Sequence, residues 1–271
     1  FWGPHTPCVL PEPYYSMYDP KKIPMDPAFE EALQGKPSHY TLISKMWGVY
    51  DLEWAEWQKI IARYYGYITM IDDAIGDFIK CLKEEGIYDN TLIIFSADHG
   101  DAMGAHKLIE KGEFMLDATY RIPLIAKHPY LKKPGVTCDE FVYLHDLCPT
   151  FIEITAGIAQ DTKGQSQSIL NLMQGEQKLS NEREYVYGEF TQHFTPFPQR
   201  MIRTKTHKLV FNAGTDGEFY DMINDPFELQ NEIDNLSFQS TKRELLQKLI
   251  SEMEKLEDPL VNWVKRIYEY Y

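Results

Sequence analysis

The residues best suited to chemistry in this chain follow directly after an apolar run. Residues 92–95 are Leu-Ile-Ile-Phe, and the run ends abruptly in Ser-Ala before Asp98-His99-Gly100. Such a run predicts a buried strand, and open α/β sheets bind ligands at the carboxyl ends of their strands. A carboxylate beside an imidazole can ligate a divalent cation. We therefore predict that Asp98 and His99 are metal ligands.

Two more polar residues follow the same predicted strand and can each meet an anion. His106 lies where the loop turns back, and Lys111 carries a compact positive charge suited to an ester oxygen. A lone Asp-His-Gly is often only a turn at a strand end. The strand before it and the His and Lys after it therefore carry the functional interpretation, which is metal-assisted chemistry on a charged ester.

Segments spread along the chain resemble, in order, those of the sulfatase family within the alkaline-phosphatase-like superfamily. Pro4-His5-Thr6-Pro7 is similar to the family's Pro-His-x-Pro segment, Asp98-His99-Gly100 to its second metal-ligand pair, and Lys111 to its active-site lysine. The resemblance implies that His5 and Lys111 are catalytic and bind the sulfate, that His106 binds substrate, and that Asp98 and His99 hold the metal. Weaker similarity extends over residues 64–73, 86–91, 121–125, 200–204 and 220–228.

The sequence departs from the family at the nucleophile. The family motif is Cys- or Ser-x-Pro-x-Arg, whose first residue becomes formylglycine, and none of the 4 cysteines begins such a motif. The upstream acidic pair that completes the metal site is also missing. Because the chain opens inside a motif, we expect it to be the C-terminal part of an enzyme whose N-terminal part carries the formylglycine. The resemblance implies Ca²⁺ as the metal, with Mg²⁺ or Mn²⁺ as alternatives.

The function implied by the resemblance is hydrolysis of a small sulfate ester, with this chain alone inactive. One alternative is a phosphodiesterase or phosphonate monoester hydrolase of the same superfamily. Another is a non-catalytic, sulfatase-like binding subunit. A sheet without its neighbours leaves an open edge and a bare apolar face. We therefore expect the N-terminal part of the same enzyme as partner, or a homo-oligomer.

Composition limits the partners. The chain has 271 residues, a hydrophobic content of 44% and a formal net charge of -14. This charge argues against a nucleic-acid partner, because binding to a phosphate backbone needs Lys and Arg. No apolar run approaches the roughly 20 residues that span a bilayer, so we expect no transmembrane segment. Nothing in the sequence assigns a compartment.

Hydrophobic periodicity predicts the elements of the first part of the chain. Apolar residues at helical spacing predict a helix over 53–85 that ends at Gly86. Short apolar runs predict strands at 92–95, 122–127 and 141–144. The loop 100–113 is polar and Gly-spaced, which places it outside the core. A further helix is expected from an N-cap at Asp146 to Gly157, followed by a polar surface connection at 158–182.

In the second part of the chain, the pattern of apolar and polar residues predicts antiparallel strands with one helix. Strands are expected at 185–190, 200–204, 208–212 and 218–222, and an amphipathic helix at 241–256. The fold class is therefore α/β. A partial alkaline-phosphatase-like α/β/α sandwich is expected over residues 1–175, and a smaller α+β subdomain with an antiparallel sheet over 176–271. His193, between two of these strands, is placed where it could overhang the site and select substrates.

Overall fold

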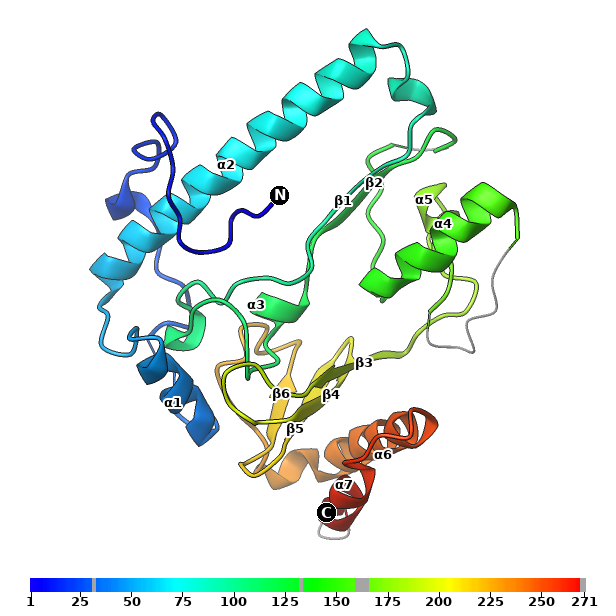
Figure 1. The fold of residues 1–271 in the computed structure, drawn as a ribbon. Helices are drawn as coiled ribbons and strands as arrows, with labels where there is room; N and C mark the ends of the chain where they lie inside the picture. The colour runs from blue at the N-terminus through cyan, green and yellow to red at the C-terminus, as the bar shows by residue number, and fades with distance from the viewer. Residues whose placement is uncertain (31–32, 132–133, 159–165, 269–271) are drawn as a thin grey trace. The chain divides into compact units, whose positions relative to one another are not determined.

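The structure is a computed structural model that describes residues 1–30, 33–131, 134–158 and 166–268. Two compact units form, and each is discontinuous in sequence (Figure 1). The first comprises residues 1–77, 99–121 and 187–271, and the second comprises residues 78–98 and 122–186. The domain boundary expected between residues 175 and 176 lies inside the second unit, because residues 166–186 pack with the strands around residue 94.

The long helix α2, Trp54–Glu84, agrees with the helix predicted at 53–85. Its first turns bury Trp57 and Ile61 against Phe29 in one of the cores of the first unit. Gly66 allows the N-terminal segment to lie directly on the helix, because a Cβ there would come within 2.3 Å of the Tyr14 carbonyl oxygen. Gly86, at φ 69°, then ends the helix as predicted.

A helix that the sequence did not predict precedes α2. Helix α1, Ser38–Met46, begins after Pro37 and buries Tyr40 and Ile43. These side chains pack with Leu108 and Phe114 in a second core of the first unit. The loop 100–113 was expected outside the core, and this expectation was wrong. Its apolar residues are spaced irregularly, so no periodicity marked them, yet Leu108 is fully buried.

The antiparallel sheet of the C-terminal region was predicted closely. It contains β3 (Tyr185–Phe190), β4 (Gln199–Thr204), β5 (His207–Asn212) and β6 (Glu218–Asp221), in that order. Strand β5 is antiparallel to both β4 and β6, with Met201 opposite Val210 and Leu209 opposite Phe219. Helix α6 (Gln239–Lys255) agrees with the predicted helix and packs against β4 and β5, and it is followed by α7 (Val261–Tyr268).

The second unit contains a two-stranded antiparallel sheet. Strand β1 (Ile93–Ser96) pairs with β2 (Leu124–Lys127), so that Ile94 lies opposite Ala126. Helices α4 (Leu147–Ala156) and α5 (Leu170–Met173) complete the unit. Ile169 and Leu179 are buried in its core, so the predicted surface connection at 158–182 is partly core. Residues 159–165 of that connection lie outside the described residues.

One further expectation for this unit was wrong, and another was confirmed in position but not in its hydrogen bond. Residues 141–144 form no strand, because the chain turns at Tyr143 into the 3-10 helix η4 (Leu144–Asp146). Asp146 stands at the N-cap of α4 but does not cap it with its side chain. Its buried carboxylate instead pairs with Arg183 at 2.6 and 2.7 Å and accepts the Gln167 backbone N–H at 2.9 Å. A buried carboxylate gains more from a bidentate guanidinium than from a cap.

Short helical turns link these elements: η1 (Pro20–Lys22), η2 (Tyr88–Asn90), η3 (Ala105–Lys107), α3 (Asp117–Tyr120) and η5 (Leu236–Phe238). The fold is α/β with antiparallel sheets, as expected. Within the described ranges, no helix is both long enough and apolar enough to cross a membrane.

Candidate active site

His5 and Lys111 meet within the first unit, although they are 106 positions apart in the sequence. The Lys111 Nζ lies 2.8 Å from His5 Nε2. On the other side of the ring, His5 Nδ1 lies 2.8 Å from the Thr6 carbonyl oxygen. An ammonium can only donate, so Nε2 accepts and Nδ1 carries the proton. The two side chains are 30% and 25% exposed, which leaves both accessible to a small anion.

Glu110 completes this contact, and sequence reasoning missed it. Its carboxylate is 3.4 Å from Lys111 Nζ and 3.9 Å from His5 Nε2, and it accepts a hydrogen bond from the Thr6 hydroxyl. The side chain is only 6% exposed. A buried carboxylate that faces an ammonium holds the lysine in place. The only signal in the sequence was its position next to Lys111.

Asp101 shapes the loop that presents Glu110. Its Oδ1 accepts the backbone N–H groups of Met103 at 2.9 Å and of Glu110 at 2.8 Å. Burial raises the pKa of Asp101, and these two hydrogen bonds work against that shift. Burial, followed by the charges of Asp101 and Glu110, also raises the pKa of Cys8. The Cys8 thiol is therefore held protonated, which is the reverse of what a nucleophilic cysteine needs.

The loop between Asp101 and Lys111 holds unusual backbone strain. Met103, His106, Lys107 and Glu110 all have φ between 42° and 58°, a left-handed region that non-glycine residues seldom adopt. Each such residue costs on the order of 1–3 kcal/mol, and clusters of them occur at functional sites. The strained residues lie in the segment for which the sequence predicted functional residues.

The segment after Lys111 is held by a buried charge network. Lys208 is fully buried, and its Nζ lies 2.7 Å from Glu228 Oε1 and 3.1 Å from the Met115 carbonyl oxygen. Lys208 also pairs with Asp117, and Glu228 Oε2 accepts the Asp117 backbone N–H at 2.7 Å. Burial opposes ionisation of Asp117, but Lys208 and Arg203 together lower its pKa. These contacts tie residues 115–117 to strand β5.

Asp98 and His99 follow the end of β1, as predicted. Gly100 donates its N–H to the Thr119 carbonyl oxygen at 2.9 Å, and a Cβ on Gly100 would lie 2.1 Å from the Ala118 carbonyl oxygen. This close approach explains why glycine follows the pair. His99 Nδ1 is 2.8 Å from the Gly100 carbonyl oxygen, a contact of the kind that sets the tautomer of metal-binding histidines.

The described residues offer few donors for the implied divalent metal. A carboxylate and an imidazole at adjacent positions suit such an ion chemically. Across the described ranges, no three His, Cys, Asp or Glu side chains gather in a way that could hold a metal. The assignment of Asp98 and His99 as two ligands of a metal site therefore stays a prediction.

His106 occupies a different environment from His5. Its side chain is buried, and Nε2 lies 3.1 Å from the Phe227 carbonyl oxygen. The backbone N–H of His106 donates to the Ala28 carbonyl oxygen at 2.9 Å. These contacts give His106 a clear part in holding the strained loop. Its predicted role in substrate binding stays a prediction.

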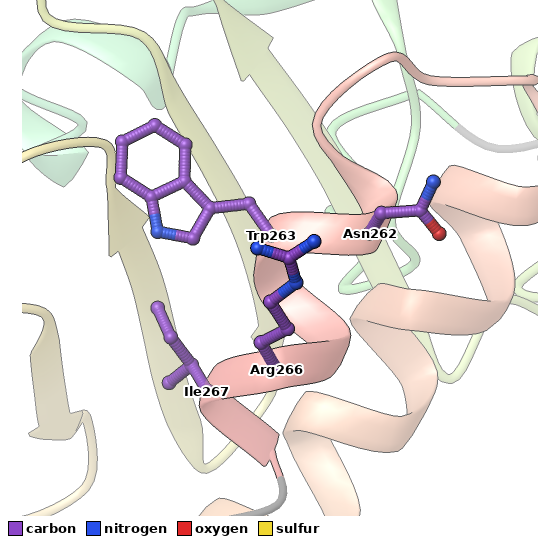
Figure 2. A pocket seen from close by; sticks show the side chains of 4 residues that line it. All are labelled: Asn262, Trp263, Arg266 and Ile267. Carbon is purple, nitrogen blue, oxygen red and sulfur yellow. The ribbon is translucent and has the colours of Figure 1, made fainter.

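A separate surface hollow lies on α7, well away in sequence from these residues (Figure 2). It measures about 410 Å³ and is lined by Asn262, Trp263, Arg266 and Ile267. Trp263 also packs edge-on against Phe211, with ring centroids 5.8 Å apart. The lining has no carboxylate and no imidazole, so it offers no proton-transfer group, and none of the predicted site residues lines it.

Comparison with known families decides the affiliation. The family model described as Sulfatase matches residues 1–158, which hold His5, Asp98, His99 and Lys111. The chain belongs to the sulfatase family. A second model, described as the C-terminal part of N-sulphoglucosamine sulphohydrolase, matches residues 104–255. The predicted resemblance, including the alkaline-phosphatase-like superfamily, is confirmed.

Individual relatives agree with this affiliation. An uncharacterised protein of Haemophilus influenzae is 32% identical over 96% of this chain and 99% of its own length. An arylsulfatase of Clostridium perfringens is 30% identical over the whole chain, which spans 56% of that protein. Among solved structures, a phosphonate monoester hydrolase of Agrobacterium radiobacter gives a TM-score of 0.80 at 25% identity over 93% of this chain and 55% of its own.

Proposed function

We propose that this chain supplies part of the active site of an enzyme that hydrolyses sulfate esters. The observation that carries the proposal is the contact between Lys111 and His5, two residues that the resemblance to the sulfatase family implied to be catalytic. Membership of the sulfatase family supports the reaction class. The chain spans about half of relatives such as the arylsulfatase, which supports an activity that belongs to a larger enzyme.

The chemistry follows from the charges of the ester. Hydrolysis breaks the bond between sulfur and the leaving oxygen, and water supplies a hydroxyl to the sulfate and a proton to the alcohol. Negative charge grows on the leaving oxygen as this bond breaks, so a fixed cation and a proton donor lower the barrier. Lys111 would bind a nonbridging oxygen. His5 Nε2 accepts from Lys111 in the absence of substrate; with the ester bound, Nε2 would instead take up a proton from water and deliver it to the leaving oxygen.

Asp98 and His99 would hold the divalent metal, for which Ca²⁺ is the first candidate and Mg²⁺ or Mn²⁺ are alternatives. When bound, such an ion supplies a positive charge that neutralises the sulfate oxygens. Formylglycine is expected outside this sequence, since no cysteine here stands in the required motif.

The open face of the small sheet supports a partner segment. Phe95 and Ile125 are paired across β1 and β2, and they are 40% and 64% exposed. An apolar cross-strand pair left in water is unfavourable, and covering it contributes stability. We propose that the N-terminal part of the same enzyme covers this face, with association of two copies as the alternative.

A second candidate function is hydrolysis of phosphonate monoesters or phosphate diesters. The observation that favours it is the structural similarity to the phosphonate monoester hydrolase, at a TM-score of 0.80. Lysine and histidine serve either anion, so these residues alone do not separate the two reactions. A non-catalytic role is the third candidate, and retention of His5, Asp98, His99 and Lys111 argues against it.

The direct test is release of inorganic sulfate from 4-nitrophenyl sulfate. We expect release by the enzyme that contains this chain together with a formylglycine-bearing part, in the presence of Ca²⁺. The 271-residue chain by itself should release none. Rapid release by the pure chain would contradict the division of the site, and absence of release by the larger enzyme would contradict sulfate-ester hydrolysis.

A further inference from the structure

Glu110 completes a closed cycle of contacts that starts and ends at Lys111. Lys111 Nζ donates to His5 Nε2 at 2.8 Å, and His5 Nδ1 donates to the Thr6 carbonyl oxygen at 2.8 Å. The Thr6 hydroxyl donates to Glu110 Oε1, and Glu110 Oε2 lies 3.4 Å from Lys111 Nζ. Thr6 therefore holds the imidazole with its backbone and the carboxylate with its side chain.

The backbone of Glu110 is fixed as firmly as its carboxylate. Its N–H donates to Asp101 Oδ1 at 2.8 Å, and its carbonyl oxygen accepts the Ala102 N–H at 2.8 Å. Glu110 has φ 58°, a conformation that a non-glycine residue keeps only when the surrounding contacts impose it. Its side chain is 6% exposed. The carboxylate thus has a fixed position out of water, where salt and solvent screen its charge weakly.

The charge of Glu110 acts on a step that Lys111 by itself would hinder. Delivery of a proton to the leaving oxygen requires a protonated His5 ring while the ester is bound. An ammonium 2.8 Å from Nε2 opposes a second positive charge on that ring, because like charges so close together repel. Glu110 Oε2 lies 3.9 Å from the same Nε2, so its negative charge offsets this repulsion.

We propose that Glu110 is a positioning residue whose negative charge stabilises His5 in its protonated form, so that the ring can protonate the leaving group. The inference rests on the proposed function. In this step the sulfur–oxygen bond breaks, the leaving oxygen keeps the electron pair and takes the proton from Nε2, and His5 returns to the neutral ring. Water supplies that proton and the hydroxyl that ends on the sulfate. Glu110 acts through His5 and not on the ester itself.

This role differs from that of a structural anchor in a property that can be measured. A leaving group that departs readily as an anion needs little help from a proton, whereas a poor leaving group depends on it. Loss of the Glu110 charge should therefore slow mainly those esters that have poor leaving groups. Loss of a structural contact would displace Lys111 and His5 for every ester and slow all of them alike.

The test compares phenyl sulfate with 4-nitrophenyl sulfate in the enzyme that contains this chain, because nitrophenolate leaves far more readily than phenolate. Glu110→Gln keeps the shape and the acceptor for the Thr6 hydroxyl but removes the charge. It should lower kcat for phenyl sulfate by about 10²-fold, the lower end of what general acid catalysis contributes, and kcat for 4-nitrophenyl sulfate by less than about threefold. The inhibition constant of inorganic sulfate should not rise, since Lys111 keeps its charge.

Two further variants separate the charge from the fold. Glu110→Asp restores the charge at a shorter reach, so it should recover part of the rate on phenyl sulfate. Thr6→Val removes the hydroxyl that orients the carboxylate, and it should slow phenyl sulfate selectively by roughly fivefold, as loss of one hydrogen bond does. If Glu110→Gln does not fold, Thr6→Val decides the question by the same comparison of the two esters.

A matched control is Glu113→Gln. Glu113 is also buried and lies two positions after Lys111, but its carboxylate accepts the backbone N–H groups of Phe194 at 2.8 Å and Thr195 at 2.7 Å. Any loss in this variant should be equal for the two esters. Equal losses in Glu110→Gln, or no loss on either ester, would overturn the inference while leaving sulfate-ester hydrolysis intact. If wild type releases sulfate from neither ester, the proposed function itself fails, and this inference fails with it.

Discussion

Lys111 Nζ donates to His5 Nε2 at 2.8 Å, and the donor and acceptor come from segments 106 residues apart. The pair is framed by Glu110, which is 3.4 Å from the lysine, and by the Thr6 carbonyl oxygen, which fixes the ring from behind. An ammonium that is already paired with a neutral imidazole and one carboxylate is ready to bind an anion without a large rearrangement. Preorganisation of this kind is the main source of electrostatic catalysis.

Lys111→Ala should lower kcat/KM for 4-nitrophenyl sulfate by about 10² to 10³, as loss of one preorganised donor does elsewhere. The protein should stay folded but melt at a lower temperature, because Glu110, which is 6% exposed, loses the ammonium that faces it. Lys59→Ala, an exposed lysine on α2, is the matched control and should leave turnover unchanged. An unfolded Lys111→Ala protein by circular dichroism would instead indicate a structural lysine.

Asp98→Ala and His99→Ala should each remove metal-dependent turnover. Loss of one ligand from a metal site lowers affinity strongly, so the purified variants should also contain less bound metal by elemental analysis. Calcium added in excess should restore little activity. Wild-type turnover together with wild-type metal content in either variant would refute the assignment of these two residues.

Glu228→Ala should destabilise the first unit by roughly 3–5 kcal/mol, because it leaves the fully buried Lys208 without a main partner. Chemical denaturation followed by circular dichroism measures this loss. The control is Glu244→Ala, which breaks an exposed pair with Lys248 on α6 and should cost less than about 1 kcal/mol. Equal losses in the two variants would show that the buried network contributes no special stability.

Because of Lys36, we expect the unfolding free energy to rise at alkaline pH. Burial lowers the pKa of Lys36 to about 8, although Glu218 and Glu228 work in the opposite direction. An unfolded lysine titrates near pH 10.4, so between about pH 8 and 10 the unfolded state holds more protons at this position. The contribution of Lys36 to the unfolding free energy therefore increases with pH, by up to about 1.4 kcal/mol per pH unit.

Lys36→Met tests this pH dependence. The variant keeps the length of the side chain but cannot titrate, so its unfolding free energy should rise less steeply with pH than that of wild type. Urea unfolding at several pH values between about 7 and 10 gives both slopes. Parallel slopes would mean that Lys36 has an ordinary pKa in the folded protein.

Much of the fold could be predicted from periodicity, and the exceptions have physical causes. The C-terminal strands alternate regularly and helices α2 and α6 have apolar stripes. The predicted ends of these elements therefore differ from the observed ends by no more than two residues. Helix α1 was missed because it follows a Pro-rich stretch that predicts turns. The buried loop 100–113 was missed because tertiary contacts, not a local pattern, bury Leu108.

Some residues of the candidate site could likewise be predicted from the sequence, and others could not. His5, Asp98, His99 and Lys111 stand in local motifs, so the sequence could mark them. The roles of Glu110 and Glu113 could not be predicted, because both depend on partners distant in sequence. Glu110 accepts a hydrogen bond from the Thr6 hydroxyl, and Glu113 accepts the backbone N–H groups of residues 194 and 195. The burial of His106 against Phe227 depends on the fold in the same manner.

The measurement that tests the central claim most directly is the ratio of kcat/KM for 4-nitrophenyl sulfate to that for 4-nitrophenyl phenylphosphonate. It should be made with the enzyme that contains this chain, in the presence of Ca²⁺. Sulfate-ester hydrolysis predicts a ratio well above one, with both activities lost in Lys111→Ala. A ratio well below one would contradict the sulfatase assignment and favour a phosphonate monoester hydrolase.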